Sequence, residues 1–258
     1  MTEPLTFDLV DDICLGLEDG ALSSAQIPSF SAQSCGPFFE LMQTLGNENC
    51  SKIQPGIYRN LATAKTQNRT RWFHANDTQG YIQVQRLLDD QLAWSDFSIR
   101  ASRAANAVGF TKADAWKLTG AIGEIYGNVI DHSERIASGY VAYATNGRTF
   151  EFVIADSGIG VLNSLRKNPA YASISDSGTA LEYALSESVS RLQDPGHGFG
   201  FRSIFVGLAN ISTRVRFRSG DYGRELIRNN DGSIPATTRQ LAVVQGMFCS
   251  VLCTATAG

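Results

Sequence analysis

The sequence predicts an α+β protein, a two-layer α/β sandwich in which a mixed, mostly antiparallel sheet carries helices on one face. Three stretches of the chain support this class. Residues 112–132 place apolar side chains at helical spacing, residues 140–155 alternate around an Asn146-Gly147 turn, and residues 241–253 form a long apolar strand interrupted at Gly246. A long helix beside adjacent antiparallel strands is the simplest way to bury these apolar faces together.

The predicted helix over 112–132 carries one polar stripe. Its start is indicated by Thr111 and Asp114, which together resemble a capping box. Side chains four apart on a helix differ by only about 40° in direction, so Glu124, Asn128 and His132 line one face. The apolar face consists of Ile122, Ile125 and Val129. Taken alone, this pattern is more typical of an ordinary amphipathic helix with a solvated polar face.

Two glycine-rich segments lie farther along the chain. The first, Asp156-Ser157-Gly158-Ile159-Gly160, follows an apolar strand. The second, at residues 196–200, leads into an apolar run at 201–208 that has helical spacing. Glycine lets a backbone approach a ligand closely, and the free amides at a helix start attract anions. The spacing matches neither the phosphate-binding P-loop nor the dinucleotide-binding pattern.

In this order, on a helix, a strand end and a helix start, the three stretches resemble the asparagine box and the two glycine boxes of the GHKL ATPase superfamily. This superfamily contains the gyrase ATPase subunit, heat-shock chaperone ATPases, mismatch-repair ATPases, sensor histidine kinases and anti-sigma-factor serine kinases. The resemblance covers about residues 111–254 and implies the Bergerat fold, with ATP and Mg²⁺ as cofactors. One departure is Met247 after Gly246, where family members often have threonine, so a hydroxyl contact near the adenine is missing or is supplied elsewhere.

The resemblance implies a role for each site residue. Asp156 would accept a hydrogen bond from the adenine amino group, and Gly158 and Gly160 would keep the backbone clear of adenine and ribose. Asn128 would be the magnesium ligand, and Glu124 would be the catalytic group that orients or deprotonates the attacking water or hydroxyl.

The remaining implied contacts concern the phosphates. The triphosphate would lie against a cofactor-binding segment that consists of Gly196, His197, Gly198, Phe199 and Gly200. His132 would line the pocket edge or contact phosphate, although a packed structural histidine explains it equally well.

The chain divides into two predicted regions. Residues 1–105 form an N-terminal region of unknown role, in which apolar runs at 7–17 and 37–45 suggest a small α/β unit and residues 81–105 read mainly as helix. Residues 106–258 form the ATP-binding domain. Within it, residues 161–195 are expected to be a lid that becomes ordered with ATP, and Thr179 and Glu182 would cap a lid helix. The apolar positions of that helix are Leu181, Leu185, Val189 and Leu192.

Composition and charge limit the classes of partner. The 258 residues carry a formal net charge of −3, which gives no bulk attraction to nucleic acid or acidic membranes. A brief basic and aromatic cluster at residues 69–74 is more often ordinary surface than a nucleic-acid contact. The N-terminus does not resemble a signal peptide, and no apolar run approaches the ~20 residues of a membrane span. A cytoplasmic protein without membrane or nucleic-acid partners is therefore expected.

The cysteines predict reduced thiols. Their number is odd, five, and there is no Cys-x-x-Cys pair or neighbouring histidine to complete a zinc site. Cys249 and Cys253 lie four apart on a predicted strand and therefore share a face, which favours core packing.

The branch of the superfamily follows from what the sequence lacks. A sensor histidine kinase needs a phosphoacceptor histidine, whereas His132 and His197 fall in the expected ATP site and His74 lacks the usual acceptor sequence. The large ATPases need a transducer domain, for which 258 residues are expected to leave no room.

We therefore expect an ATP/ADP- and magnesium-binding regulatory protein of the anti-sigma-kinase type. It would hydrolyse ATP or phosphorylate a regulatory protein partner on serine or threonine, and a homodimer is compatible with the sequence. The alternative is a non-catalytic module in which ATP only orders the lid and so creates a surface for a protein partner.

Overall fold

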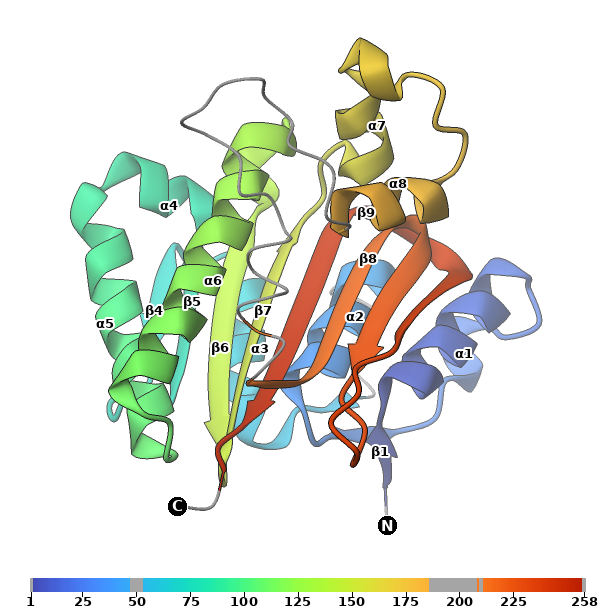
Figure 1. Ribbon diagram of the computed structural model, residues 1–258. Coiled ribbons are helices and arrows are strands. Elements are labelled where there is room, and N and C mark those ends of the chain that lie inside the picture. The colour runs from blue at the N-terminus through green and yellow to red at the C-terminus, as the bar shows by residue number, and fades with distance from the viewer. Residues whose placement is uncertain (1, 47–52, 186–207, 209–210, 257–258) are drawn as a thin grey trace.

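The computed structural model describes residues 2–46, 53–185, 208 and 211–256. Its central element is a six-stranded sheet with the strand order β4-β5-β6-β7-β9-β8, in which all neighbouring pairs are antiparallel (Figure 1). The strands are β4 (Arg71–Phe73), β5 (Gln79–Gln83), β6 (Tyr140–Asn146), β7 (Thr149–Asp156), β8 (Ser212–Ile227) and β9 (Ala236–Thr254). The prediction of an α+β protein with a mostly antiparallel sheet is confirmed.

The hairpin of β6 and β7 forms as its turn residues predict. Tyr140 pairs with Ala155 and Asn146 with Thr149. Gly147 has a φ of 58°, a left-handed conformation that glycine adopts without steric cost. The local turn chemistry therefore fixes the register of the two strands at the middle of the sheet.

The hairpin of β8 and β9 is longer than expected. From the sequence alone, residues 214–218 and 224–228 are expected to be two separate short strands. In the structure residues 214–218 and 224–227 belong to the single strand β8, because the register shifts between Ser219 and Tyr222 without ending the pairing. β9 continues through Gly246, whose φ of 79° lies where the register with β8 shifts, so the predicted interruption is a local irregularity within one strand. A Cβ at Gly246 would lie 2.2 Å from the carbonyl oxygen of Asp156, so only glycine fits against the end of β7.

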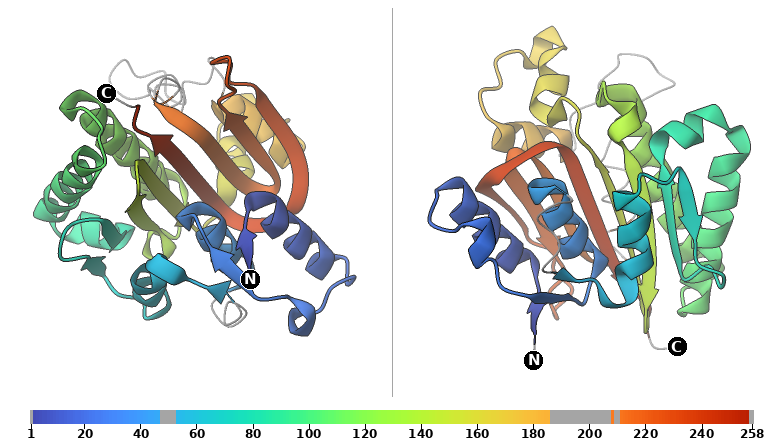
Figure 2. Two further views of the ribbon diagram at one scale, coloured as in Figure 1. Left: turned by 90° about the horizontal axis from the view of Figure 1, so that it is seen from below. Right: turned by 180° about the vertical axis from the view of Figure 1, so that it is seen from behind.

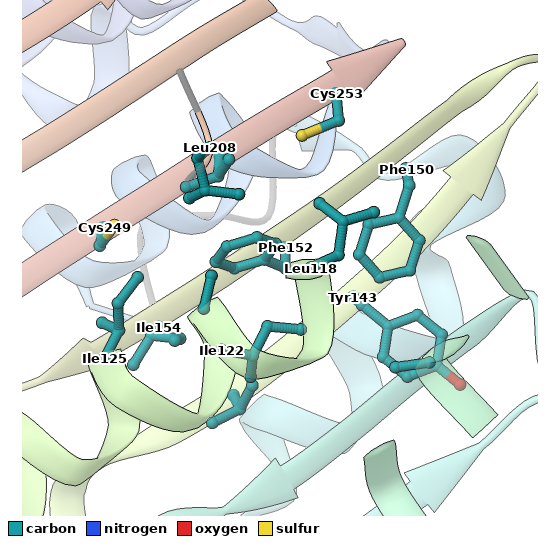
Figure 3. Close-up of a cluster of buried hydrophobic side chains, with 14 of the residues drawn as sticks. Leu118, Ile122, Ile125, Tyr143, Phe150, Phe152, Ile154, Leu208, Cys249 and Cys253 are labelled. Carbon is teal, nitrogen blue, oxygen red and sulfur yellow. The ribbon is translucent and has the colours of Figure 1, made fainter. Parts of the chain in front are cut away.

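One face of the sheet is covered by two long helices, α5 (Gln91–Ala107) and α6 (Lys112–His132). α6 occupies the predicted range, and its predicted cap forms, because the Asp114 amide donates to Thr111 Oγ1 at 3.1 Å. The buried side chains of α6 pack with those of β6, β7 and β9 in one apolar core (Figure 3). This core includes Leu118, Ile122, Ile125, Val129, Phe152, Ile154 and Cys249.

The opposite face of the sheet is covered by residues 3–46 and 53–66, which we call the N-terminal module (Figure 2). The module consists of α1 (Phe7–Glu18), α2 (Cys35–Leu45), α3 (Arg59–Thr66) and a parallel sheet of β1 (Glu3–Leu5), β2 (Phe30–Ala32) and β3 (Ile53–Gln54). The small α/β unit expected there is present. The prediction of helices on one face only is wrong, because α1 and α2 also pack on the sheet.

The sequence of β7 explains why both faces of the central sheet are covered. Phe152 and Ile154 of β7 belong to the core beneath α6, whereas Val153 and Ala155 belong to the core beneath the N-terminal module. A strand with one solvated face alternates apolar and polar residues. The unbroken apolar run at residues 152–155 is instead typical of a strand that is buried on both sides.

The predicted helix over residues 81–105 begins too early. Residues 79–83 form β5, in which Tyr81 and Ile82 pair with Ala142 and Val141, and α4 (Val84–Asp89) and α5 follow. Tyr81 and Ile82 are buried in cores on opposite faces of the sheet, and consecutive apolar residues of this kind resemble a helical pattern. The central sheet therefore contains strands from both sides of residue 106, the expected start of the ATP-binding domain.

A cluster of buried ionic side chains joins the N-terminal module to β8. Arg216 donates to Glu40 at 2.7 and 2.8 Å and to Asp11 at 2.5 Å, and Arg218 donates to Glu40 at 2.5 Å. Each of these four residues is at most 3% exposed. Burial alone would raise the pKa of Glu40, but the charges of Arg216 and Arg218 outweigh burial and lower this pKa below its usual value. The cluster thus attaches α1 and α2 to the sheet.

The cysteines of the described residues are free and buried, as the sequence predicts: Cys14, Cys35, Cys249 and Cys253. Cys249 and Cys253 both lie in the core beneath α6, so the predicted shared face is confirmed. Burial raises the pKa of the Cys14 thiol to about 12 and also raises the pKa of Cys249 well above its usual value. Cys50 lies outside the described residues.

Candidate functional site

The C-terminal ends of α6 and β7 lie at the same end of the central sheet, toward the top of Figure 1. The amide of Ile159, in the loop after β7, donates to the carbonyl oxygen of Ser133, the C-cap residue of α6, at 3.0 Å. A Cβ on Gly158 would lie only 2.0 Å from the same oxygen. The loop and the last turn of α6 are therefore in close contact, so the loop that follows Asp156 lies at the C-terminal end of the helix that carries the polar stripe.

Asp156, the last residue of β7, has a buried carboxylate. Asp156 as a whole is 3% exposed, and its Oδ1 accepts a hydrogen bond from the Gly158 amide at 2.7 Å. In the described part of the chain, no cation pairs with Asp156 and no donor reaches its Oδ2. Burial raises the pKa of Asp156 to about 6, and the Gly158 amide offsets this effect only in part. A carboxyl group with a spare oxygen and a perturbed pKa is typical of a ligand-binding position.

Asp156 should make the folded protein less stable as pH rises from about 4 to about 6. Its folded-state pKa of about 6 lies above the ordinary aspartate value of about 3.9, so the folded protein binds this proton more tightly than the unfolded chain does. The stabilising effect of the proton is fully present below about pH 4 and is lost as the group ionises. Asp156→Asn should therefore raise the free energy of unfolding by ~1–3 kcal/mol at about pH 7.5, measured by urea titration.

Two comparisons control this prediction. At about pH 4 the parent and Asp156→Asn should differ little, because the parent carboxyl is then largely protonated in the folded state. Asp131→Asn, on the exposed side of α6, should leave stability unchanged at both pH values. A gain of equal size at both pH values would show that ionisation of Asp156 is not its cause.

The polar stripe of α6 lies away from its buried face, as the spacing predicts. Glu124 is exposed, whereas Asn128 and His132 are half-buried. Asn128 Nδ2 donates to the carbonyl oxygen of Glu124 at 2.8 Å, so Oδ1 is the amide atom left to contact a ligand. The Glu124 carboxylate has no hydrogen bond or ion pair with the residues that the structure describes. The stripe thus offers an amide oxygen and a carboxylate, which are suitable ligands for a hard cation.

The glycines after β7 are required by packing within the protein. Gly160 has a φ of 75°, and a Cβ there would lie 2.9 Å from Ser219 Oγ. Ser219 Oγ accepts the Val161 amide at 2.9 Å and donates to the carbonyl oxygen of Gly246 at 2.7 Å. Together with the contact of Gly158 against α6, these bonds explain both glycines without a ligand. Their predicted role of leaving space for adenine and ribose stays a prediction.

A cavity of about 550 Å³ lies beside the same loop. Its lining includes residues 158–160 and 243–246, and its polar side chains are Arg135, Asn163, Ser177, Ser219 and Gln245. Neither Asp156 nor the polar stripe of α6 lines this cavity. The cavity therefore lies beside the candidate site, and its lining does not include the carboxylates and amide that are expected to bind the base and the cation.

The predicted lid lies only partly within the described residues. Residues 160–185 form α7 (Gly160–Arg166), a 3-10 turn (Pro169–Tyr171) and α8 (Ser177–Leu185). α8 starts before the predicted cap: Asp176 Oδ1 accepts the Thr179 amide at 2.8 Å, and Glu182 lies 3.4 Å from Arg224. The predicted cap of Thr179 with Glu182 is therefore wrong, because Asp176 takes the capping position.

The second glycine-rich segment cannot be placed in the same way. The residues of the prediction that lie outside the described chain are Val189, Leu192, Gly196, His197, Gly198, Phe199 and Gly200. Leu208, at the end of the predicted helix after them, is described and is buried in the core beneath α6 (Figure 3).

One residue at the site is absent from the sequence-based prediction. Gln43, in the last turn of α2, donates through Nε2 to the carbonyl oxygen of Asp156 at 3.1 Å and to Ser157 Oγ at 3.0 Å. Gln43 precedes Asp156 by 113 residues. No local pattern marks a glutamine near a helix end as a site residue, so its place depends on how the N-terminal module packs.

No family model matches the sequence, and no curated protein matches it. Among the residues that the structure describes, no three or more His, Cys, Asp or Glu side chains form a group that could hold a metal ion. None of the described helices is both long enough and apolar enough to cross a membrane.

Proposed function

We propose that this chain is an ATP- and magnesium-binding regulatory protein of the GHKL type, with a Bergerat fold in residues 106–258. It would hydrolyse ATP or transfer the terminal phosphoryl group to serine or threonine of a partner protein. The order of the three sequence stretches and the packing of α6 along an antiparallel sheet support this proposal. The observation that carries it is the buried Asp156 carboxylate, which has a spare acceptor oxygen beside the end of α6.

Asp156 supports adenine as the base. The exocyclic amine of adenine would donate a hydrogen bond to its free oxygen, whereas guanine would present a carbonyl oxygen there and be repelled. Met247 pairs with Asp156 in the register of β7 and β9, and its side chain is 5% exposed in the core beneath α6. A threonine hydroxyl is therefore absent from this position, and we expect base recognition to depend strongly on Asp156.

The polar stripe of α6 supports a cation and a phosphate beside the base. Asn128 Oδ1 would be a protein ligand of Mg²⁺, which commonly takes few protein oxygens together with phosphate and water. Bound ATP and magnesium would supply the phosphoryl group that is transferred. Glu124, one turn before Asn128, would orient or deprotonate the attacking water or hydroxyl, and His132 would line the edge of the site.

A non-catalytic binding module is the second candidate function. The exposed Glu124 carboxylate has no hydrogen-bond partner in the described residues that would hold it in one direction for catalysis. In a module of this kind, the nucleotide would change only the surface that is presented to a protein partner. The two candidates share the nucleotide site and differ in whether Glu124 has a chemical role.

Asp156→Asn should weaken ATP binding by about 1.5–3 kcal/mol, or roughly 10- to 150-fold in Kd, because a charge-assisted hydrogen bond is lost. Titration calorimetry with ATP and Mg²⁺ measures this change. The parent should also bind ATP more tightly than GTP, and the variant should discriminate less between them. Asp12→Asn, at an exposed position of α1 on the opposite face of the sheet, is the matched control and should bind like the parent. Equal ATP affinity of Asp156→Asn and the parent would contradict the assignment of Asp156.

A further inference from the structure

Both ends of α2 are attached to β7 or to the loop that follows it. At the first end, the amides of Cys35 and Gly36 donate to the Glu151 carboxylate at 2.7 and 2.8 Å. At the other end, Gln43 Nε2 donates to the Asp156 carbonyl oxygen and to Ser157 Oγ. Glu151 lies near the middle of β7 and Asp156 at its end, so α2 connects the interior of the strand to the candidate site.

The position of α2 leaves Gln43 little freedom. A Cβ on Gly36 would lie 2.6 Å from Glu151 Oε1, so the helix start is in direct contact with β7. In the middle of α2, Glu40 is 0% exposed and is held by Arg216 and Arg218 of β8. The last turn of the helix is therefore placed against the loop by two anchors that precede it.

The loop at Asp156 is held from two directions. On the side of α6, the Ser157 amide donates to Ser138 Oγ at 2.9 Å and the Ile159 amide donates to Ser133. On the side of the N-terminal module, the hydrogen bonds to residues 156 and 157 in the described structure come from Gln43. Because Gln43 contacts the carbonyl oxygen of Asp156 itself, a change at Gln43 can rotate the peptide that carries the Asp156 side chain.

We infer that Gln43 is a positioning residue for nucleotide recognition, through which the N-terminal module sets the direction of the Asp156 carboxylate. The inference rests on the proposed function and gives the N-terminal module a part in base selection. Gln43 itself touches no reacting atom. Its effect is exerted through the peptide of Asp156 and the hydroxyl of Ser157.

Gln43→Met tests the inference, because methionine keeps the length of the side chain and removes the donor. Gln85→Met is the matched control: Gln85 is on α4, and within the described residues its side-chain amide donates to Asp89 of the same helix at an exposed position. The Kd values for ATP and GTP with Mg²⁺ are measured by calorimetry, and the melting temperature is measured for each protein. We expect Gln43→Met to bind ATP about 3- to 10-fold more weakly, because the Asp156 carboxylate is then less well pre-positioned for the base, with a smaller change for GTP. Because both lost hydrogen bonds lie within the protein, its melting temperature should also fall relative to that of the control.

The outcomes separate the inference from the proposed function. If the parent binds neither nucleotide, the proposed function fails and the inference fails with it. If the parent prefers ATP and Gln43→Met keeps the ATP affinity and the ATP/GTP ratio of Gln85→Met, the inference alone is overturned. Loss of ATP and GTP affinity by the same factor would assign Gln43 a general structural role and would also overturn it. A fall in the ATP/GTP ratio of a variant that is folded at the assay temperature supports it.

Discussion

Replacing Glu40 by glutamine should lower the free energy of unfolding by about 3–5 kcal/mol, the largest stability effect that we expect from one substitution. Glu40 is 0% exposed and accepts hydrogen bonds from Arg216 and Arg218. Glutamine preserves the shape of the side chain but leaves two buried guanidinium charges with Asp11 as their nearest remaining carboxylate. Urea unfolding followed by circular dichroism measures the change.

Glu182→Gln is the control for this prediction, because it makes the same chemical change in an exposed ion pair. The Glu182 side chain is 57% exposed and lies 3.4 Å from Arg224, and such surface pairs contribute about 0–1 kcal/mol. Equal losses in the two variants would mean that the buried cluster contributes no more than a surface pair. If Glu40→Gln does not fold, Asp11→Asn, which leaves the bonds of Glu40 in place, should give a smaller loss in a folded protein.

Elements with local signals can be predicted from this sequence. α6 has the predicted bounds because Thr111 and Asp114 mark its start within one turn and its apolar period continues to the end. The β6–β7 hairpin is predicted because Asn146 and Gly147 specify its turn. In both cases the residues that decide the structure are neighbours in the chain.

The second covered face depends on contacts that are distant in the sequence. The hydrogen bonds from Cys35 to Glu151 and from Gln43 to Asp156 span 116 and 113 residues. Glu40 by itself is typical of a solvated helix face, and it is buried only because Arg216, 176 residues later, reaches it. No local pattern contains these pairings, so the packing of the N-terminal module could not be derived from spacing alone.

The candidate site also combines features that a local sequence pattern predicts with features that depend on long-range packing. The place of Asp156 at the end of a buried strand follows from the apolar run before it. Its raised pKa does not, because that shift is caused by burial in the folded protein. The glycine at 158 is conspicuous in the sequence, yet the contact that requires it is with Ser133 of α6. A motif can therefore indicate a candidate site, while the packing reason for each of its residues appears only in the folded structure.

Replacing Glu124 by glutamine should lower turnover by on the order of 10²-fold or more while ATP affinity stays nearly unchanged. The amide keeps the shape of the side chain but cannot accept the proton of an attacking water or hydroxyl. Glu124 is exposed and its carboxylate makes no hydrogen bond within the described residues, so the substitution should not disturb folding. Release of ADP and calorimetric affinity for ATP, measured on the same preparations, separate chemistry from binding.

Glu18→Gln is the control, since it makes the same change at an exposed glutamate of α1, which packs on the opposite face of the sheet from α6. It should keep both the turnover and the affinity of the parent. A catalytic role for Glu124 requires a loss of turnover that the control does not share and that the ATP affinity does not explain. If the parent shows no turnover with any partner and Glu124→Gln supports the same nucleotide-dependent capture of a partner protein, Glu124 has no catalytic role. The chain would then be a nucleotide-dependent binding module, because the site would bind ATP without a group that activates the acceptor.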